Sequence, residues 1–134
     1  MPSESTAVPE TLLGPVELAA IAHGGHCVAR VDGRVIFLRS TEIEWLEAEG
    51  NYVKLHVAGV AHLFRETLSA LEADLPPDQF LRISRSVIVN LDSVRELQPL
   101  FYGDYAVLLR DGTKLTLSRT YRDRLEKLLE RRGG

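Results

Sequence analysis

The chain has 134 residues, of which 45% are hydrophobic and 26% charged, a composition typical of one globular domain with a single core. The only cysteine, Cys27, excludes an internal disulfide and a cysteine-based metal cage. We find neither a secretory signal nor an apolar run long enough for a membrane span, and we therefore expect a reduced, cytoplasmic protein.

The net charge of −3 is unevenly distributed along the chain. Residues 1–49 hold 3 basic and 8 acidic side chains, whereas residues 50–134 hold 13 basic and 11 acidic ones. Because local patches set the field that a phosphate backbone feels, the net charge neither supports nor excludes a nucleic-acid partner.

Residues 1–26 are predicted to be an N-terminal tail that precedes a folded domain at 27–134. The opening residues have no hydrophobic periodicity, and Gly24-Gly25 forms a flexible joint. Residues 16–22 are compatible with a short helix that begins next to Pro15. His23, His26 and Cys27 lack a fourth metal ligand, so we predict no metal site here.

From Cys27 onward, the pattern is one of short strands separated by turns. Asp32-Gly33 and Asp111-Gly112 are each flanked by apolar runs, which is a strong hairpin signal. Leucines at helical spacing indicate one short helix at 67–75, which ends at Pro76-Pro77, and a C-terminal helix at 121–132. The predicted strands are 27–31, 35–38, 43–48, 52–57, 61–65, 94–97, 105–110 and 114–118, with two more within 80–90.

The stretch 80–90 contains a break in its alternation. A continuous strand would carry Arg85 into the core, and burying an unpaired guanidinium costs several kcal/mol. We therefore expect two strands joined by a tight turn at Ser84-Arg85-Ser86, with Arg85 in solvent. The regular turn signals together predict a mostly β fold with about nine or ten short strands, in a sandwich-like or multi-sheet arrangement.

Three polar clusters lie at predicted turns or strand ends. Arginine can pair with the guanine edge, asparagine with adenine, and lysine, serine and tyrosine with phosphates, which favours a nucleic-acid interface. Any globular surface carries such residues, so each cluster alone is also compatible with a solvated turn. The candidate residues are Asn51, Tyr52 and Lys54; Ser84, Arg85 and Ser86; and Ser118, Arg119, Tyr121 and Arg122.

Three blocks resemble the consensus of the LytTR DNA-binding domain. They read EAEGNYVKL at 47–55, FLRISRSVIVN at 80–90 and LSRTY at 117–121. Residues 63–75, 103–105 and Asp111-Gly112 match the order and spacing of that family, so the resemblance covers roughly residues 27–130. It implies an elongated arrangement of small antiparallel β-sheets with little helix.

The resemblance also implies a function. Members of the family are transcription regulators that dock loops into successive major grooves of DNA, commonly as two copies on a repeated site. By position, the DNA-contacting segments fall on residues 51–54, on Arg85 with Ser86, and on Arg119. Arg85 and Arg119 are then expected at base edges. Phosphate or positioning contacts are expected from Tyr52, Lys54, Ser84, Ser86, Tyr121 and Arg122. Many members carry an N-terminal receiver domain, for which 26 residues are too few, so we expect a stand-alone regulator or a fragment of a longer protein.

The sequence also bears on two other classes of function, enzymes and protein-interaction modules. No nucleophile motif, phosphate-binding glycine loop or paired-carboxylate motif occurs, so we predict neither an enzyme nor a cofactor site. Asn90, at a strand end, is expected to bond nearby backbone. The alternative function is a protein-interaction module on the same β fold, which would have an exposed apolar edge and no DNA specificity.

Overall fold

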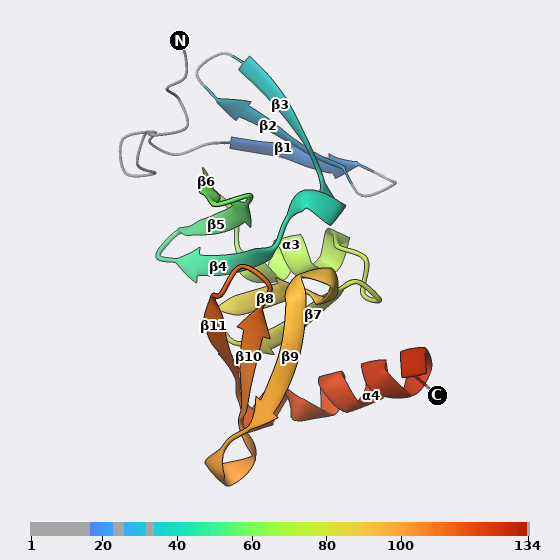
Figure 1. Ribbon diagram of the computed structural model, residues 1–134. Helices are drawn as coiled ribbons and strands as arrows, with labels where there is room; N and C mark the ends of the chain where they lie inside the picture. The colour runs from blue at the N-terminus through green and yellow to red at the C-terminus, as the bar shows by residue number, and fades with distance from the viewer. Residues whose placement is uncertain (1–16, 23–25, 32–33, 134) are drawn as a thin grey trace.

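The computed structural model describes residues 17–22, 26–31 and 34–133 (Figure 1). This part of the chain forms eleven strands and two α-helices, joined by short 3₁₀ turns. The predicted mostly β fold, with one short internal helix and a C-terminal helix, is confirmed. No helix in these residues is long and apolar enough to cross a membrane.

The strands form three antiparallel sheets. The N-terminal sheet contains β1 (Glu17–Ala22), β2 (His26–Val31) and β3 (Arg34–Arg39), in that order. The middle sheet has the order β6-β5-β4-β8-β7, and its strands are β4 (Trp45–Glu49), β5 (Tyr52–Val57), β6 (Val60–Phe64), β7 (Phe80–Ser84) and β8 (Val87–Asn90). The C-terminal sheet has the order β11-β10-β9, and its strands are β9 (Val94–Pro99), β10 (Tyr105–Leu109) and β11 (Lys114–Leu117).

The helix predicted within residues 16–22 is wrong, because Glu17–Ala22 is strand β1 and pairs antiparallel with β2. A helix this short is only marginally stable without a packed face, whereas pairing with β2 satisfies backbone hydrogen bonds along the segment. Residues 1–16 lie outside the described residues, as does the Asp32-Gly33 turn. The domain boundary between residues 26 and 27 stays a prediction.

The first hydrophobic core lies between the middle sheet and α3 (Leu68–Asp74). Val53 and Leu55 of β5 are buried, as their alternation predicts, and they pack in one cluster with Leu71 of the helix. Thr67 caps the helix, because its Oγ1 accepts a hydrogen bond from the Ala70 N–H at 3.1 Å. Such a cap contributes about 1 kcal/mol.

A second core lies on the other face of the β7–β8 hairpin. Ile83 and Val89 pack there against Val107 and Leu117 of the C-terminal sheet and against Leu125 of α4 (Arg122–Gly133). The neighbouring residues Phe80 and Ile88 belong to the first core. The hairpin is therefore enclosed by apolar side chains on both faces, and its turn is held in a rigid frame.

Candidate nucleic-acid interface

The β7–β8 hairpin ends in a two-residue turn, Arg85-Ser86, as predicted. Ser84 pairs with Val87 across the strands, and the Ser86 N–H donates to Ser84 Oγ at 3.2 Å. Arg85 and Ser86 are both exposed, so the break in alternation does place the arginine in solvent. Among the described residues, the Arg85 guanidinium makes no ion pair or hydrogen bond.

Arg82, which was not predicted as a site residue, stabilises this turn through hydrogen bonds. Its Nε donates to the carbonyl oxygen of Ser84 at 2.9 Å, and its Nη2 donates to that of Arg85 at 2.6 Å. Its Nη1 bonds Glu72 Oε1 of α3 at 2.8 Å. The Arg82 side chain is only 12% exposed, so these charge-assisted bonds are partly shielded from water and fix the direction of the turn.

The β4–β5 turn lies at the same end of the middle sheet. Strand β4 pairs with both β5 and β8, and the Ala48 N–H donates to the Ser86 carbonyl at 2.8 Å. Gly50 has a φ of 61°, a left-handed conformation that a tight turn requires and that glycine adopts without strain. The exposed Asn51 follows it, and Tyr52 and Lys54 are partly exposed on β5. Lys54 Nζ forms an ion pair with Glu49 at 2.7 Å.

The third candidate segment follows β11 and reaches the same end. The Ser118 N–H donates to the Ile83 carbonyl at 3.0 Å, and this bond joins the segment to the end of β7. Arg119 is exposed in the 3₁₀ turn Arg119–Tyr121, and among the described residues its guanidinium makes no ion pair or hydrogen bond. Tyr121 instead lies under the Arg124 guanidinium, 5.0 Å from the ring centroid. Arg122 Nε lies 3.5 Å from Glu126 Oε2.

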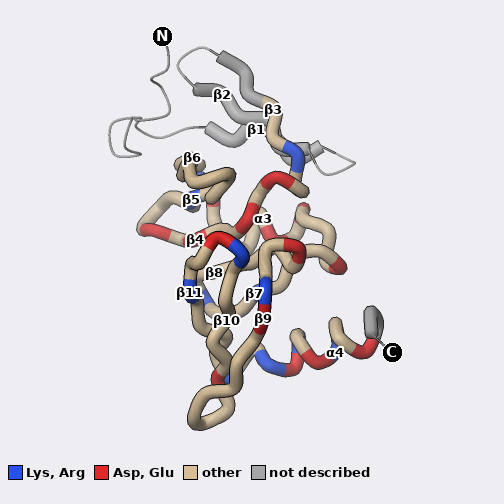
Figure 2. The backbone as a smooth tube through the Cα atoms, viewed as in Figure 1, with Lys and Arg blue, Asp and Glu red and all other residues tan. Residues whose placement is uncertain are grey.

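We call the end formed by these three segments the turn end of the middle sheet. Two of its arginines, Arg85 and Arg119, present guanidinium groups without an intramolecular partner in the described chain, whereas Lys54 and Arg122 are ion-paired. Figure 2 shows basic and acidic positions interspersed over the described chain. The turn end therefore depends on a few well-placed cations and not on a uniformly basic face.

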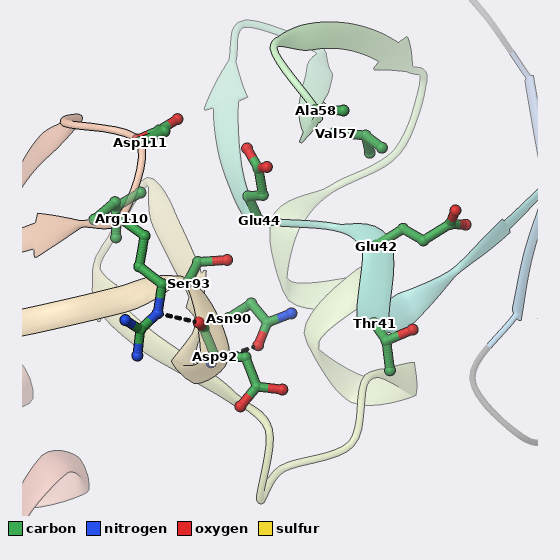
Figure 3. Close-up of a pocket in the computed structure, with 11 residues that line it drawn as sticks. Thr41, Glu42, Glu44, Val57, Ala58, Asn90, Asp92, Ser93, Arg110 and Asp111 are labelled. Carbon is green, nitrogen blue, oxygen red and sulfur yellow. Dashed lines mark hydrogen bonds between the residues drawn. The ribbon is translucent and has the colours of Figure 1, made fainter.

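The opposite end of the middle sheet has a different character. A hollow of about 610 Å³ lies there between the start of β4, the β5–β6 turn and the β10–β11 turn. Figure 3 shows four carboxylates around it, those of Glu42, Glu44, Asp92 and Asp111. Hydrogen bonds from Thr113 lower the pKa of Asp111, so this carboxyl is charged at neutral pH. This acidic end would repel a polyanion.

Asn90 lies beside the acidic end. The prediction that its side chain bonds to backbone is confirmed. Asn90 is 1% exposed, and its Nδ2 donates to the Ile43 carbonyl at 2.8 Å. Its Oδ1 accepts from Gln79 Nε2 and from the Asp92 N–H, at 2.6 Å and 2.9 Å. In the described part of the chain no group of three His, Cys, Asp or Glu side chains is arranged to hold a metal ion. The cluster of His23, His26 and Cys27 lies outside the described side chains.

The comparisons with known proteins agree on one family. The family model "LytTr DNA-binding domain" matches residues 33–130. The sensory transduction protein LytT of Bacillus subtilis is 34% identical over 116 residues, which are 85% of this chain and 48% of that protein. The transcriptional regulatory protein LytR of Staphylococcus aureus is 28% identical over 91 residues, or 68% of this chain and 37% of that protein. The chain thus spans about half or less of these relatives.

A solved structure has the same fold. It is the LytTr DNA-binding domain of a putative methyl-accepting/DNA response regulator from Bacillus cereus, which superposes with a TM-score of 0.70. The match covers 78% of this chain and 96% of that chain, at 22% sequence identity. At this identity the likeness establishes the fold alone.

Proposed function

Because the chain belongs to the LytTr DNA-binding domain family, we propose that it is a transcription regulator that binds duplex DNA sequence-specifically through the turn end. The observation that best supports this is the meeting of three polar segments there, two of which carry an arginine without an intramolecular partner. A guanidinium fork on a guanine edge is the commonest specific contact in the major groove.

Each candidate residue then has a role that follows from its chemistry. Arg85 and Arg119 form bidentate hydrogen bonds with base edges, where each good pair contributes about 1–3 kcal/mol of discrimination. Asn51 has the amide that can pair with adenine. The other candidates hold phosphates or position the readers, which fixes the register of the protein on the duplex. They are Tyr52, Lys54, Ser84, Ser86, Ser118, Tyr121 and Arg122.

The rigid support of the turn matters for recognition because a mobile arginine loses conformational entropy on binding. Arg82 anchors the carbonyls of Ser84 and Arg85, and Ser118 is bonded to Ile83. These bonds hold the backbone from which Arg85 and Arg119 project. A further part of the proposal is that two copies occupy a repeated site in promoter DNA. We also propose that the protein acts in the cytoplasm, where the bacterial chromosome lies.

Selection from a pool of random duplexes tests the proposal directly. We expect enrichment of one sequence, to which the protein binds with a steep salt dependence. Arg119→Ala should lower cognate affinity by about 1–3 kcal/mol and relax the preference at one base position. Lys54→Ala should weaken binding equally on all sequences and reduce the salt slope by about one. A pool that yields no enriched sequence would point instead to the protein-interaction alternative.

A further inference from the structure

The loop between β9 and β10 carries two aromatic side chains that the fold leaves in solvent. Phe101 is 85% exposed and Tyr102 is 86% exposed. Their ring centroids lie 6.4 Å apart, with an interplanar angle of 57°. Figure 1 shows this loop as the projecting tip of the C-terminal sheet, and Figure 2 shows it without charge. Large aromatic side chains dominate contact energetics when they are buried, so an exposed pair indicates a contact surface.

The shape of the loop is defined by its own backbone. Tyr102 has a φ of 65° and Gly103 a φ of 87°, so two successive residues are left-handed. The Leu100 N–H donates to the Asp104 carbonyl at 2.8 Å and closes the loop. A tyrosine in this conformation is strained, and such strain persists only where the surroundings hold it and is typical of functional sites.

The loop is joined directly to the third candidate segment. Asp104 Oδ1 accepts a hydrogen bond from the Arg119 N–H at 2.9 Å. A Cβ atom on Gly103 would lie 3.3 Å from Arg119 Cβ and 3.2 Å from Arg122 Nη1, so the absence of a side chain permits this close packing. A hollow of about 600 Å³ lies between the loop and the start of α4. It is lined by Tyr102, Gly103, Arg119, Thr120, Arg122 and Asp123.

We infer that the aromatic loop, residues 100–103, is a further DNA contact, an inference that rests on the proposed function. Arg122 attracts a phosphate toward the hollow, and Phe101 and Tyr102 pack against the deoxyribose and base edges beside it. Deoxyribose rings and thymine methyl groups are apolar parts of the duplex surface, and proteins contact them with aromatic or aliphatic side chains.

The charges beside the loop favour DNA over a second copy of this chain as the occupant. Two copies that met through this loop would bring their Arg119 and Arg122 side chains toward each other, although Asp123 and Glu126 offset part of that charge. A duplex instead supplies phosphates for the cations and apolar sugars for the rings. The loop is also continuous with the segment that we assign to base reading.

The test is a double substitution, Phe101→Ser with Tyr102→Ser, measured on the selected duplex and on a shortened duplex that holds one binding site. Affinity should fall about tenfold or more on both duplexes, which is the loss expected when two large apolar side chains are no longer buried. The salt slope should not change, because no charge is removed, whereas Arg122→Ala should reduce it by about one. Phe37→Ser is the matched control, since Phe37 is 67% exposed on β3 and distant in the fold, and it should leave affinity unchanged.

Three results would overturn the inference. Wild-type affinity of the double variant would mean that the loop does not contact DNA, while the proposed function would stand. A loss on the two-site duplex alone would mean that the loop contacts a second copy. An equal loss in the Phe37 control would mean that the effect is general to exposed apolar residues. A wild-type protein that enriches no sequence would instead refute the proposed function itself.

Discussion

The two ends of the middle sheet are built from the same strands, yet they differ in charge and in shape. At the turn end, two-residue turns project Asn51 and Arg85, whereas at the acidic end the segment before β4, the β5–β6 turn and the β10–β11 turn surround a hollow with carboxylates. Strand β4 has 5 residues and so separates the two ends by about 16 Å. The Debye length at physiological salt is about 8 Å, so each end presents its own field to a partner. An overall charge of −3 is therefore compatible with an anionic partner.

The most direct test of the difference between the two ends is to remove one exposed arginine from each. Arg85→Ala should lower affinity for the selected duplex by about 1–3 kcal/mol, because it removes a base contact. Arg110→Ala, its matched control at the acidic end, should leave affinity unchanged. Fluorescence anisotropy on the selected and a scrambled duplex measures both. Equal losses for the two variants, or equal losses of the Arg85 variant on both duplexes, would remove Arg85 from the role of base reader.

A subtler variant tests whether the frame behind the turn matters. Arg82→Lys keeps the charge but cannot donate to Glu72 and to two turn carbonyls in the fork geometry of arginine. We expect about 1–2 kcal/mol lower stability in urea unfolding, since hydrogen bonds to a charged group are lost.

The same variant should bind the selected duplex several-fold more weakly, because the direction of Arg85 is less well fixed. Affinity for random duplex and the salt slope should stay the same, as the charge is retained. Loss of affinity for both kinds of duplex would assign Arg82 a phosphate contact in place of a positioning role.

The smallest expected effect is on the pH dependence of stability. It comes from a residue that lies away from both ends of the middle sheet. Burial lowers the pKa of His62 on β6 below its ordinary value of 6.5. Because the folded protein binds this proton less readily than the unfolded chain, the stability contribution is complete above pH 6.5. It decreases as the pH falls through the lowered, folded-state pKa.

Urea unfolding at pH 7.5 and pH 5 should therefore show a smaller loss of stability for His62→Gln than for the wild type. DNA affinity at pH 7.5 should be the same for both proteins, since His62 is not part of the turn end. An identical pH dependence in the two proteins would contradict the assigned role of His62.

Local patterns in the sequence were sufficient to predict much of the turn end. The alternation in β5 predicts which of its residues are buried, and the break in alternation at Arg85 predicts the β7–β8 turn. Both features depend on neighbouring residues, for which periodicity is informative. That the segments converge at one end depends on strand order, which the residues alone do not specify.

Two features of the structure were missed for physical reasons. Strand β1 was interpreted as a helix because a short run of alanine, leucine and isoleucine fits either structure, and its pairing with β2 decides between them. The bonds of Arg82 depend on where the turn carbonyls point and on the placement of α3, which is distant in sequence. Such contacts come from tertiary geometry and leave no periodic signal.

The β7–β8 hairpin lies between the two hydrophobic cores and contributes side chains to both. A substitution that loosens packing on either side reaches the same pair of strands, and through them Arg85. Under the proposed function, interior residues far from the duplex would therefore affect recognition as well as folding. Substitutions should be tolerated best along the exposed surface of α4, away from its core residues Leu125 and Leu128.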